Sequence, residues 1–300
     1  MKVLVVDDSA LDRRLAGRII TRRTDFEVAY AEDGEDALAR IATDRPDVVL
    51  TDLLMPKLTG LQLVEQVRAQ WSDLPVILMT AHGSEETAVT ALRRGAASYV
   101  PKRNLAGELI RTLRDVAALA PQPRTRARSE LDSRVSIEET FELDYAPQRL
   151  QRLLEHLESQ LAAMEICDET AGIQVAVALR EALVNATHHG NLELDSTLKE
   201  EGAWERTAAE RQSISPYRER RVRVTARHLR GAVATYTVTD EGAGFDPTTL
   251  PDPTDPRNLE QVHGRGLMLI RTFMDAVEHN ARGNEITMTK RATSPAPDAA

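Results

Sequence analysis

Polar side chains lie where short apolar runs end in the first third of the chain, and together they could bind a cation and a phosphoryl group. They are Asp7, Asp8, Asp52, Thr80 and Lys102. Three carboxylates placed together repel one another unless a cation lies between them, and hard oxygen ligands suit Mg²⁺. A phosphoryl group on Asp52 would contact that cation, the Lys102 ammonium and the Thr80 hydroxyl. The pattern predicts a magnesium site at which Asp52 accepts phosphate.

A second set of reactive residues lies on a predicted helix in the run EALVNATHHG. Glu181, Asn185 and either His188 or His189 are three or four residues apart, so they share one helix face. Two glycine-containing runs follow it, TDEGAGFDP and HGRGL. Glycines without a Cβ let the backbone approach a polyphosphate, and the free N–H groups of a helix start can receive its oxygens.

These residues require elements that bring them together, and the chain divides into two patterns. Over residues 1–119, five apolar runs alternate with amphipathic stretches, which predicts an α/β fold: a doubly wound, flavodoxin-like parallel sheet of five strands covered by five helices. In such a sheet functional groups collect at the carboxyl ends of the strands. Residues 120–135 are charged, contain proline and lack apolar periodicity, so they form a predicted linker.

Residues 136–292 combine helical patterns with strands that pair antiparallel, which predicts an α+β sandwich. Two helices are expected over about 147–164 and 169–189, then a hairpin through an RG turn, a glycine- and proline-rich loop, a short helix and a last hairpin. The tail 293–300 is predicted to be disordered.

The first part resembles the response-regulator receiver family through VVDDS, TDLLMPKLTG, MTAHG and SYVPK. The resemblance implies that Asp52 is the phosphoacceptor and that Asp7 and Asp8 bind Mg²⁺ with it. It also implies that Thr80 and Tyr99 form a switch pair and that Lys102 contacts the phosphoryl group.

The chain departs from that family after the fifth strand. The family commonly has proline directly after the lysine, whereas here Pro101 precedes Lys102 and Arg103 follows it. The geometry of this loop is therefore left open.

The second part resembles the GHKL ATPases, which have the Bergerat fold, and within them the anti-sigma-factor serine kinases. The runs DEGAGFDP and GRGLMLIRTFMDAVEHNARGNEITMTKR carry the likeness. It implies ATP as ligand, with Asn185 holding a Mg²⁺ beside the phosphates and Asp240 accepting a hydrogen bond from the adenine amino group. The glycines implied in the pocket are Gly242 and Gly244 around the adenine, and Gly264 and Gly266 at the end of the ATP lid.

Glu181, one helical turn from Asn185, is the candidate base for activating a serine hydroxyl or a water. His188 or His189 could contact phosphate, although a histidine on a helix face is more often simply exposed. An extra segment at 191–220 is either a solvated helical insertion or a partner-binding arm. Four prolines in DPTTLPDPTDPRNLEQVH suggest a stiff lid.

Three functions remain open. The first is control by phospho-Asp52 of an ATP-dependent kinase that phosphorylates a serine or threonine of an anti-anti-sigma-like partner. The second is a non-catalytic, ATP-dependent module that sequesters a sigma factor or its antagonist. The third is an atypical histidine kinase, for which the candidate phosphoacceptor is His156, within one ordinary amphipathic helix.

Bulk properties narrow the setting. The chain has 300 residues, a formal net charge of −9 and one cysteine, Cys167, which exclude an internal disulfide framework and argue against direct nucleic acid binding. The start MKVLVVDDSA matches neither a signal peptide nor a membrane span, so a cytoplasmic protein is expected. The expected partners are an upstream histidine kinase or phosphotransfer protein and a sigma-factor or anti-anti-sigma-like protein, with a homodimer implied by the kinase resemblance.

Overall fold

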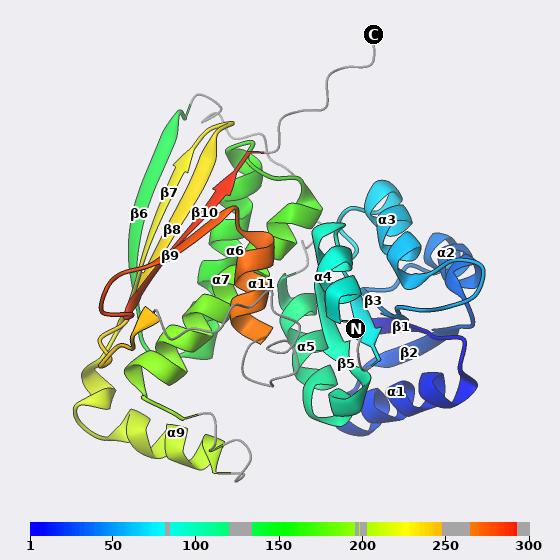
Figure 1. The fold of residues 1–300 in the computed structure, drawn as a ribbon, viewed down its shortest axis with the longest axis horizontal. Helices are drawn as coiled ribbons and strands as arrows, with labels where there is room; N and C mark the ends of the chain where they lie inside the picture. Colours follow the sequence, from blue (N-terminus) through cyan, green and yellow to red (C-terminus); the bar gives the residue numbers. More distant parts are fainter. Residues whose placement is uncertain (82–84, 120–133, 196–197, 199–202, 248–264, 293–300) are drawn as a thin grey trace. The chain divides into compact units, whose positions relative to one another are not determined.

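The chain forms two compact units, described here from a computed structural model (Figure 1). The structure describes residues 1–81, 85–119, 134–195, 198, 203–247 and 265–292. The first unit consists of Met1–Thr125 together with Asp168–Val177. The second unit consists of Arg126–Cys167 together with Ala178–Ala300. Residues 120–133 of the predicted linker (120–135) and the tail at 293–300 lie outside the described residues.

The first unit is built on a parallel sheet of five strands in the order β2-β1-β3-β4-β5. Strands β3 and β4 are buried on both faces, which explains why their sequences, VVLTD and VILMT, are almost continuously apolar. The five strands are β1 (Lys2–Val6), β2 (Glu27–Ala31), β3 (Val48–Asp52), β4 (Val76–Thr80) and β5 (Ser98–Pro101).

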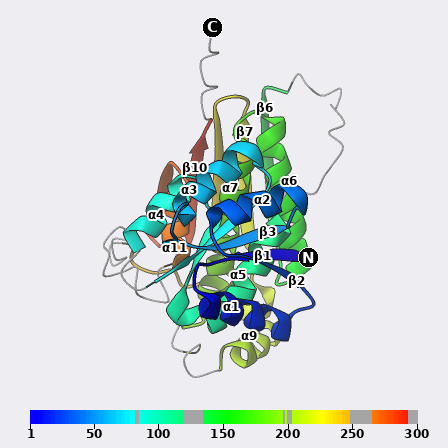
Figure 2. The same cartoon turned by 90° about the vertical axis from the view of Figure 1, so that its right-hand side faces the viewer.

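Helices cover both faces of this sheet, and the pairs α1–α5 and α2–α3 pack on opposite sides (Figures 1 and 2). Side-chain caps fix three helix starts: Ser9, Asp33 and Thr59 each accept a hydrogen bond from a backbone N–H of the first turn. The helices are α1 (Ala10–Arg23), α2 (Gly34–Thr43), α3 (Gly60–Gln70), α4 (Glu85–Arg93), η1 (Lys102–Asn104) and α5 (Leu105–Leu119). The predicted flavodoxin-like fold is confirmed.

The second unit contains an antiparallel sheet of five strands in the order β6-β7-β8-β10-β9. Buried and more exposed side chains alternate along β7 and β8, so one face of the sheet is covered and the other is open. The strands are β6 (Ser136–Leu143), β7 (Val222–Leu229), β8 (Val233–Thr239), β9 (Ala276–His279) and β10 (Glu285–Arg291).

Helices α6, α7 and α11 lie along the covered face of this sheet, which gives the predicted α+β sandwich (Figure 1). The helical elements are α6 (Pro147–Ala163), α7 (Glu169–Asn185), η2 (Ala186–Asn191), α9 (Trp204–Ser213), η3 (Tyr217–Glu219) and α11 (Arg265–Phe273). None of the helices in the described part of the chain is both long and apolar enough to cross a membrane.

Helix α7 belongs to both units, a feature that the sequence pattern does not reveal. Its residues up to Val177 are grouped with the first unit, and those from Ala178 with the second. The helix therefore provides a continuous covalent element between the sheet that ends in Asp52 and the residues Glu181 and Asn185.

Candidate functional site

The strand ends of the first unit bring Asp7, Asp52 and Lys102 together. The Lys102 ammonium Nζ lies 2.8 Å from Asp7 Oδ2 and 2.7 Å from Asp52 Oδ1. Asp7 is completely buried and Asp52 is 7% exposed, so the two carboxylates share one cation in a largely water-excluded site. A third acid, Asp12 in the first turn of α1, lies 3.2 Å from the same ammonium and was not predicted.

Backbone geometry holds the two carboxylates in place. The Ser9 N–H donates to Asp7 Oδ1 at 2.9 Å, and the Leu54 N–H donates to Asp52 Oδ2 at 3.0 Å. Gly60 lies so close to Asp52 that a Cβ on it would be 2.1 Å from the Asp52 carbonyl oxygen. The loop that follows Asp52 is thus packed against the start of α3, where only glycine fits.

The charges of this site are strongly coupled. Burial raises the pKa of Asp7 despite its bond to Lys102, and the negative charge of Asp52 adds to the rise. Burial alone would lower the pKa of Lys102, but its hydrogen bonds to Asp52 and Asp7 outweigh that and raise it. Lys102 thus holds its positive charge firmly, and the Asp7 carboxyl binds a proton more readily than an exposed aspartate does.

The donor set fits a hard cation, because Asp7 and Asp52 present carboxylate oxygens to one position and Asp8 is exposed next in sequence. Among the described residues, however, no three His, Cys, Asp or Glu side chains are arranged as a ready metal site. The Lys102 ammonium holds the two buried acids instead. The Mg²⁺ site of Asp7, Asp8 and Asp52 therefore stays a prediction.

The predicted switch pair lies behind these acids. Thr80 ends β4 and is 2% exposed, and Tyr99 on the neighbouring β5 is 3% exposed. Strand β5 continues from Tyr99 to Pro101, and Lys102 opens the short helix η1. The proline before Lys102 is accommodated at the sheet edge, where it pairs with Thr80.

The second unit places Asp240 at the end of β8 in a pocket of backbone and arginine groups. The Gly242 N–H donates to Asp240 Oδ1 at 2.8 Å. Asn284, in the turn before β10, bonds to the Asp240 backbone in both directions, at 2.9 Å and 2.8 Å. The Asp240 carboxylate is therefore positioned by the strand ends of both β8 and β10.

Burial raises the pKa of Asp240 to about 6, against the lowering effects of the Gly242 N–H and the charges of Arg220 and Arg282. Its exposure is 8%. A buried carboxylate with this pKa is poised to accept a hydrogen bond from a ligand amine near neutral pH, because the bond would replace its lost hydration.

Glycines make the close approaches around Asp240. A Cβ on Gly190 would lie 2.4 Å from the Asp240 carboxyl carbon, and one on Gly242 would lie 2.3 Å from the Gly190 carbonyl oxygen. Gly244 has a φ of +80° and faces the Arg282 backbone. Gly190 and Gly242 thus pack against the Asp240 carboxylate, although no role was predicted for Gly190, and the adenine-pocket role of Gly242 and Gly244 stays a prediction.

Glu181 and Gly266 are brought together from α7 and α11. A Cβ on Gly266 would lie 2.7 Å from Glu181 Oε2, so the carboxylate faces the first turn of α11. Asn185 follows Glu181 by one helical turn and is partly buried. The other predicted lid glycine, Gly264, and most of the predicted lid lie outside the described residues.

The histidines after Asn185 differ from the sequence picture. The predicted helix to His189 changes its pitch: α7 ends at Asn185, and Ala186–Asn191 form a π-helix. His188 and His189 both pack against the Trp204 ring, with ring centroids 5.5 Å and 5.6 Å away. His189 Nδ1 also lies 2.8 Å from the Leu194 carbonyl.

The remaining candidate histidine, His156 on α6, lies 2.9 Å from the Glu139 carboxylate and packs against Phe141.

Asn191, which was not predicted, is fully buried and accepts a hydrogen bond from the Glu241 N–H at 2.7 Å, while its Nδ2 has no partner among the described residues. No sequence pattern distinguishes Asn191 from the histidine-containing run that precedes it.

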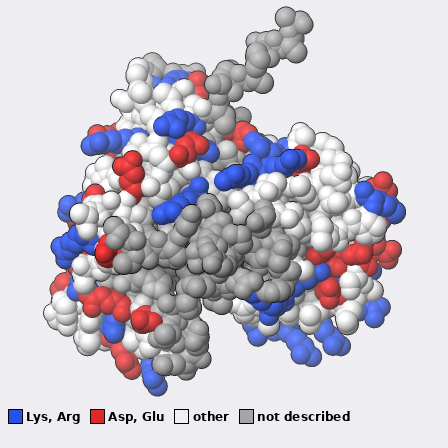
Figure 3. Space-filling model, viewed as in Figure 1, with Lys and Arg blue, Asp and Glu red and all other residues white. Residues whose placement is uncertain are grey.

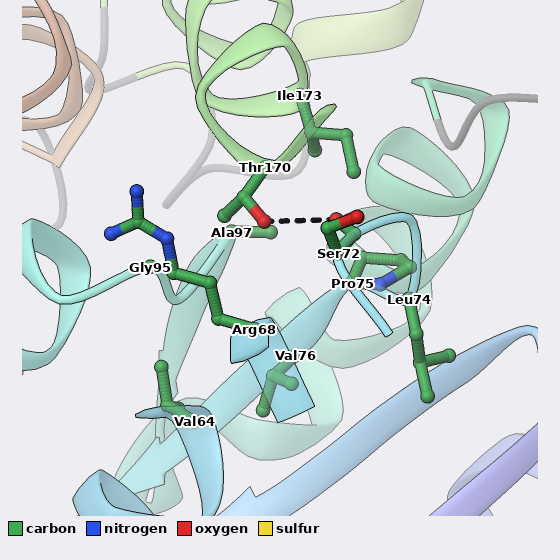
Figure 4. A pocket seen from close by; sticks show the side chains of 10 residues that line it. All are labelled: Val64, Arg68, Ser72, Leu74, Pro75, Val76, Gly95, Ala97, Thr170 and Ile173. Carbon is green, nitrogen blue, oxygen red and sulfur yellow. Dashed lines mark hydrogen bonds between the residues drawn. The ribbon is translucent and has the colours of Figure 1, made fainter. Parts of the chain in front are cut away.

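The first turns of α7 are anchored within the first unit, around a small pocket at the starts of β4 and β5 (Figure 4). The Thr170 hydroxyl donates to the Ser72 carbonyl at 2.8 Å. The Gln174 amide donates to the carbonyls of Leu92 at 2.7 Å and Ala96 at 3.0 Å. These two carbonyls end α4 and lead into β5, so α7 is bonded to the segment between Thr80 and Tyr99.

Comparison with known proteins matches residues 3–114 to the response regulator receiver domain and residues 143–290 to the histidine kinase-like ATPase domain. Response regulator MprA of Mycolicibacterium vanbaalenii is 39% identical over 114 residues, which are 38% of this chain and 49% of that protein. MprA of Mycobacterium tuberculosis is 38% identical over 114 residues, again 38% and 49% of the two chains. The chain thus spans about half the length of these relatives. The crystallised receiver domain of NtrX from Brucella abortus is 34% identical, with a TM-score of 0.35, and covers 37% of this chain and 98% of that one.

The matches identify a receiver domain that is followed along the chain by a histidine kinase-like ATPase domain. The predicted fusion of these two domains is therefore confirmed.

Proposed function

We propose that phosphorylation of Asp52 controls an ATP-dependent kinase that transfers the γ-phosphoryl group to a serine or threonine of a partner resembling an anti-anti-sigma factor. The observation that carries this proposal is the position of Glu181. Its carboxylate faces the first turn of α11 at Gly266, and Asn185 lies one turn further along α7. A base, a metal-binding amide and a helix start therefore meet at one place.

The chemistry balances with these groups. Glu181 takes the proton of the partner hydroxyl as its oxygen forms a bond to the γ-phosphorus, and the bond to the β-phosphate oxygen breaks to release ADP. Mg²⁺ held by Asn185 would neutralise charge on the phosphates. The N–H groups at the start of α11 receive phosphate oxygens, and Gly266 lets the backbone approach them.

Nucleotide selection is assigned to Asp240. Its buried carboxylate accepts one hydrogen bond from Gly242, which leaves oxygen lone pairs for an amine donor such as the adenine amino group. A side chain at Gly190 or Gly242 would collide with Asp240 or with the Gly190 backbone, so both positions beside the carboxylate suit only glycine.

Receiver control is supported by helix α7. Thr170 and Gln174 bond it to the first unit, and Glu181 and Asn185 lie on the same helix seven or more residues later. Phosphorylation that displaces the segment between Thr80 and Tyr99 would move the helix that bears the proposed base. The proposed phosphodonor is a histidine kinase or phosphotransfer protein, and a homodimer is expected by analogy with the serine kinases that the domain resembles.

The charges on the described surface agree with a protein partner better than with nucleic acid. On the face drawn in Figure 3, acidic and basic side chains are interspersed, and the whole chain is acidic with a net charge of −9.

The test uses γ-labelled ATP in a soluble extract of the source organism, with wild type, Glu181→Gln and Asn185→Ala. We expect an acid-stable label on a second protein with wild type only. Glu181→Gln should still bind ATP, because it keeps the side chain's shape, whereas Asn185→Ala should lose binding.

Other outcomes assign other functions. Partner capture that survives in Asn185→Ala without ATP would favour the sequestering module. An acid-labile label would indicate histidine or aspartate chemistry. An equal label with and without beryllofluoride at Asp52 would refute receiver control.

A further inference from the structure

The π-helical segment η2 connects the two ends of the proposed nucleotide site. It begins directly after Asn185 and ends in Gly190 and Asn191. Gly190 lies against the Asp240 carboxylate, and Asn191 Oδ1 accepts the Glu241 N–H at 2.7 Å. The path of these six residues therefore sets the distance between the phosphate end and the base end of the site.

A π-helix is rarely stable alone, because its wide turns pack poorly, and it is found most often at functional sites. Here the exit from η2 also includes Glu193, a non-glycine residue with a positive φ of 49°. Both features need support from surrounding groups.

Two arginines of the extra segment supply part of this support. Arg211 on α9 donates to the carbonyls of Leu192 and Glu193, each at 2.6 Å. Arg220 donates to the Asn191 carbonyl at 2.7 Å and to Glu193 Oε1 at 2.9 Å. They bind the carbonyls that the end of a helix leaves without intrahelical donors.

An aromatic contact supplies the rest of the support for η2. The Trp204 ring packs edge-on against His188 and at a tilt against His189, and with Leu192, Leu194 and Ala208 it forms a small core of the extra segment. The segment is therefore packed onto η2 through its own hydrophobic core, which a freely solvated insertion would lack.

We infer that the extra segment is a brace for the nucleotide site, and that Trp204 is a positioning residue that holds η2 in its π-helical path. The inference rests on the proposed function for its consequence, that ATP affinity depends on Trp204. It answers the question that the sequence left open: the described part of 191–220 serves the chain's own site.

The experiment compares Trp204→Leu, which keeps apolar volume but removes the ring, with Trp204→Phe, which keeps an aromatic ring. Leu198→Ala is the matched control, because it loosens the same small core without removing a ring from the histidines. Hydrogen exchange of the amides of 186–194 is measured in the full chain without nucleotide, and binding of a fluorescent ATP analogue with Mg²⁺ is measured separately.

We expect faster exchange over 186–194 in Trp204→Leu than in either Trp204→Phe or Leu198→Ala. Affinity for the analogue should fall about tenfold in Trp204→Leu, the effect of losing one to two aromatic pairs, and should be nearly kept in Trp204→Phe. Unchanged exchange in Trp204→Leu would overturn the brace whether or not nucleotide binds. Failure of the wild type to bind the analogue would instead refute the proposed function, and exchange would still decide the brace.

Discussion

The raised pKa of Asp240 makes ATP binding depend on pH. A carboxyl that titrates at about 6 is roughly one-tenth ionised at pH 5 and nine-tenths ionised at pH 7. Only the ionised form accepts the adenine amine with both oxygens, so affinity should fall about tenfold between pH 7 and pH 5. Asp240→Asn has no titrating group and should lose this component.

The free protein should show the opposite trend. Because burial raises the folded-state pKa of Asp240 to about 6, above the usual 3.8 of an aspartate, ionising it opposes folding. The contribution of the protonated Asp240 carboxyl to the free energy of unfolding is present at low pH. It is lost as pH rises from about 4 to about 6, which lowers the free energy of unfolding by roughly 3 kcal/mol. ATP binding therefore favours the ionised carboxyl of Asp240, whereas acid stabilises the free domain by protonating that carboxyl.

The assay is calorimetric titration with ATP and Mg²⁺ from pH 5 to pH 8 for wild type, Asp240→Asn and Asp144→Asn. The last is a control carboxylate on the loop before α6. Since the nucleotide phosphates also titrate in this range, the difference between wild type and Asp240→Asn carries the result. Parallel pH curves for these two proteins would refute the reasoning.

Two further predictions concern the receiver and its link to α7. Lys102→Met leaves Asp7 and Asp52 without their shared cation, so the first unit should lose about 3 kcal/mol of unfolding free energy at pH 7. It should regain part of that free energy at pH 5, because the two acids protonate. Chemical denaturation at both pH values measures this, and a loss that is constant with pH would contradict it. Gln174→Leu removes the donor to the carbonyls of Leu92 and Ala96, so beryllofluoride should no longer change the labelling of the partner. Gln151→Leu on α6 serves as the matched control. An unchanged beryllofluoride effect in Gln174→Leu would show that control by Asp52 does not depend on this contact.

Much of the fold could be predicted because periodicity reports burial directly. The runs VVLTD and VILMT are apolar because both faces of β3 and β4 are covered, and alternation in β7 follows from its one covered face. The change of pitch at Ala186 could not be predicted. Its surroundings are tertiary contacts, among them Gly190 on Asp240 and Trp204 on His188, which leave no local pattern.

The candidate sites divide in the same way. Asp7, Asp52 and Lys102 were predicted because strand ends in a parallel sheet must converge, whatever the loops do. Asp12, Asn191 and Asn284 were missed because each lies at a helix end or in a turn, where polar residues are expected without any functional role.

The residues of α7 that make contacts with the first unit and those proposed for the nucleotide site lie on one side of the helix. Thr170, Gln174, Glu181 and Asn185 lie within about 60° of one another around the helix, because steps of four, seven and four residues nearly complete whole turns. Gln174 precedes Glu181 by about 10 Å along the axis at 1.5 Å per residue. Gln174 bonds this helix to Leu92 and Ala96, and the helix continues into η2, which packs against Trp204. We therefore expect loss of either contact, at Gln174 or at Trp204, to weaken control by Asp52.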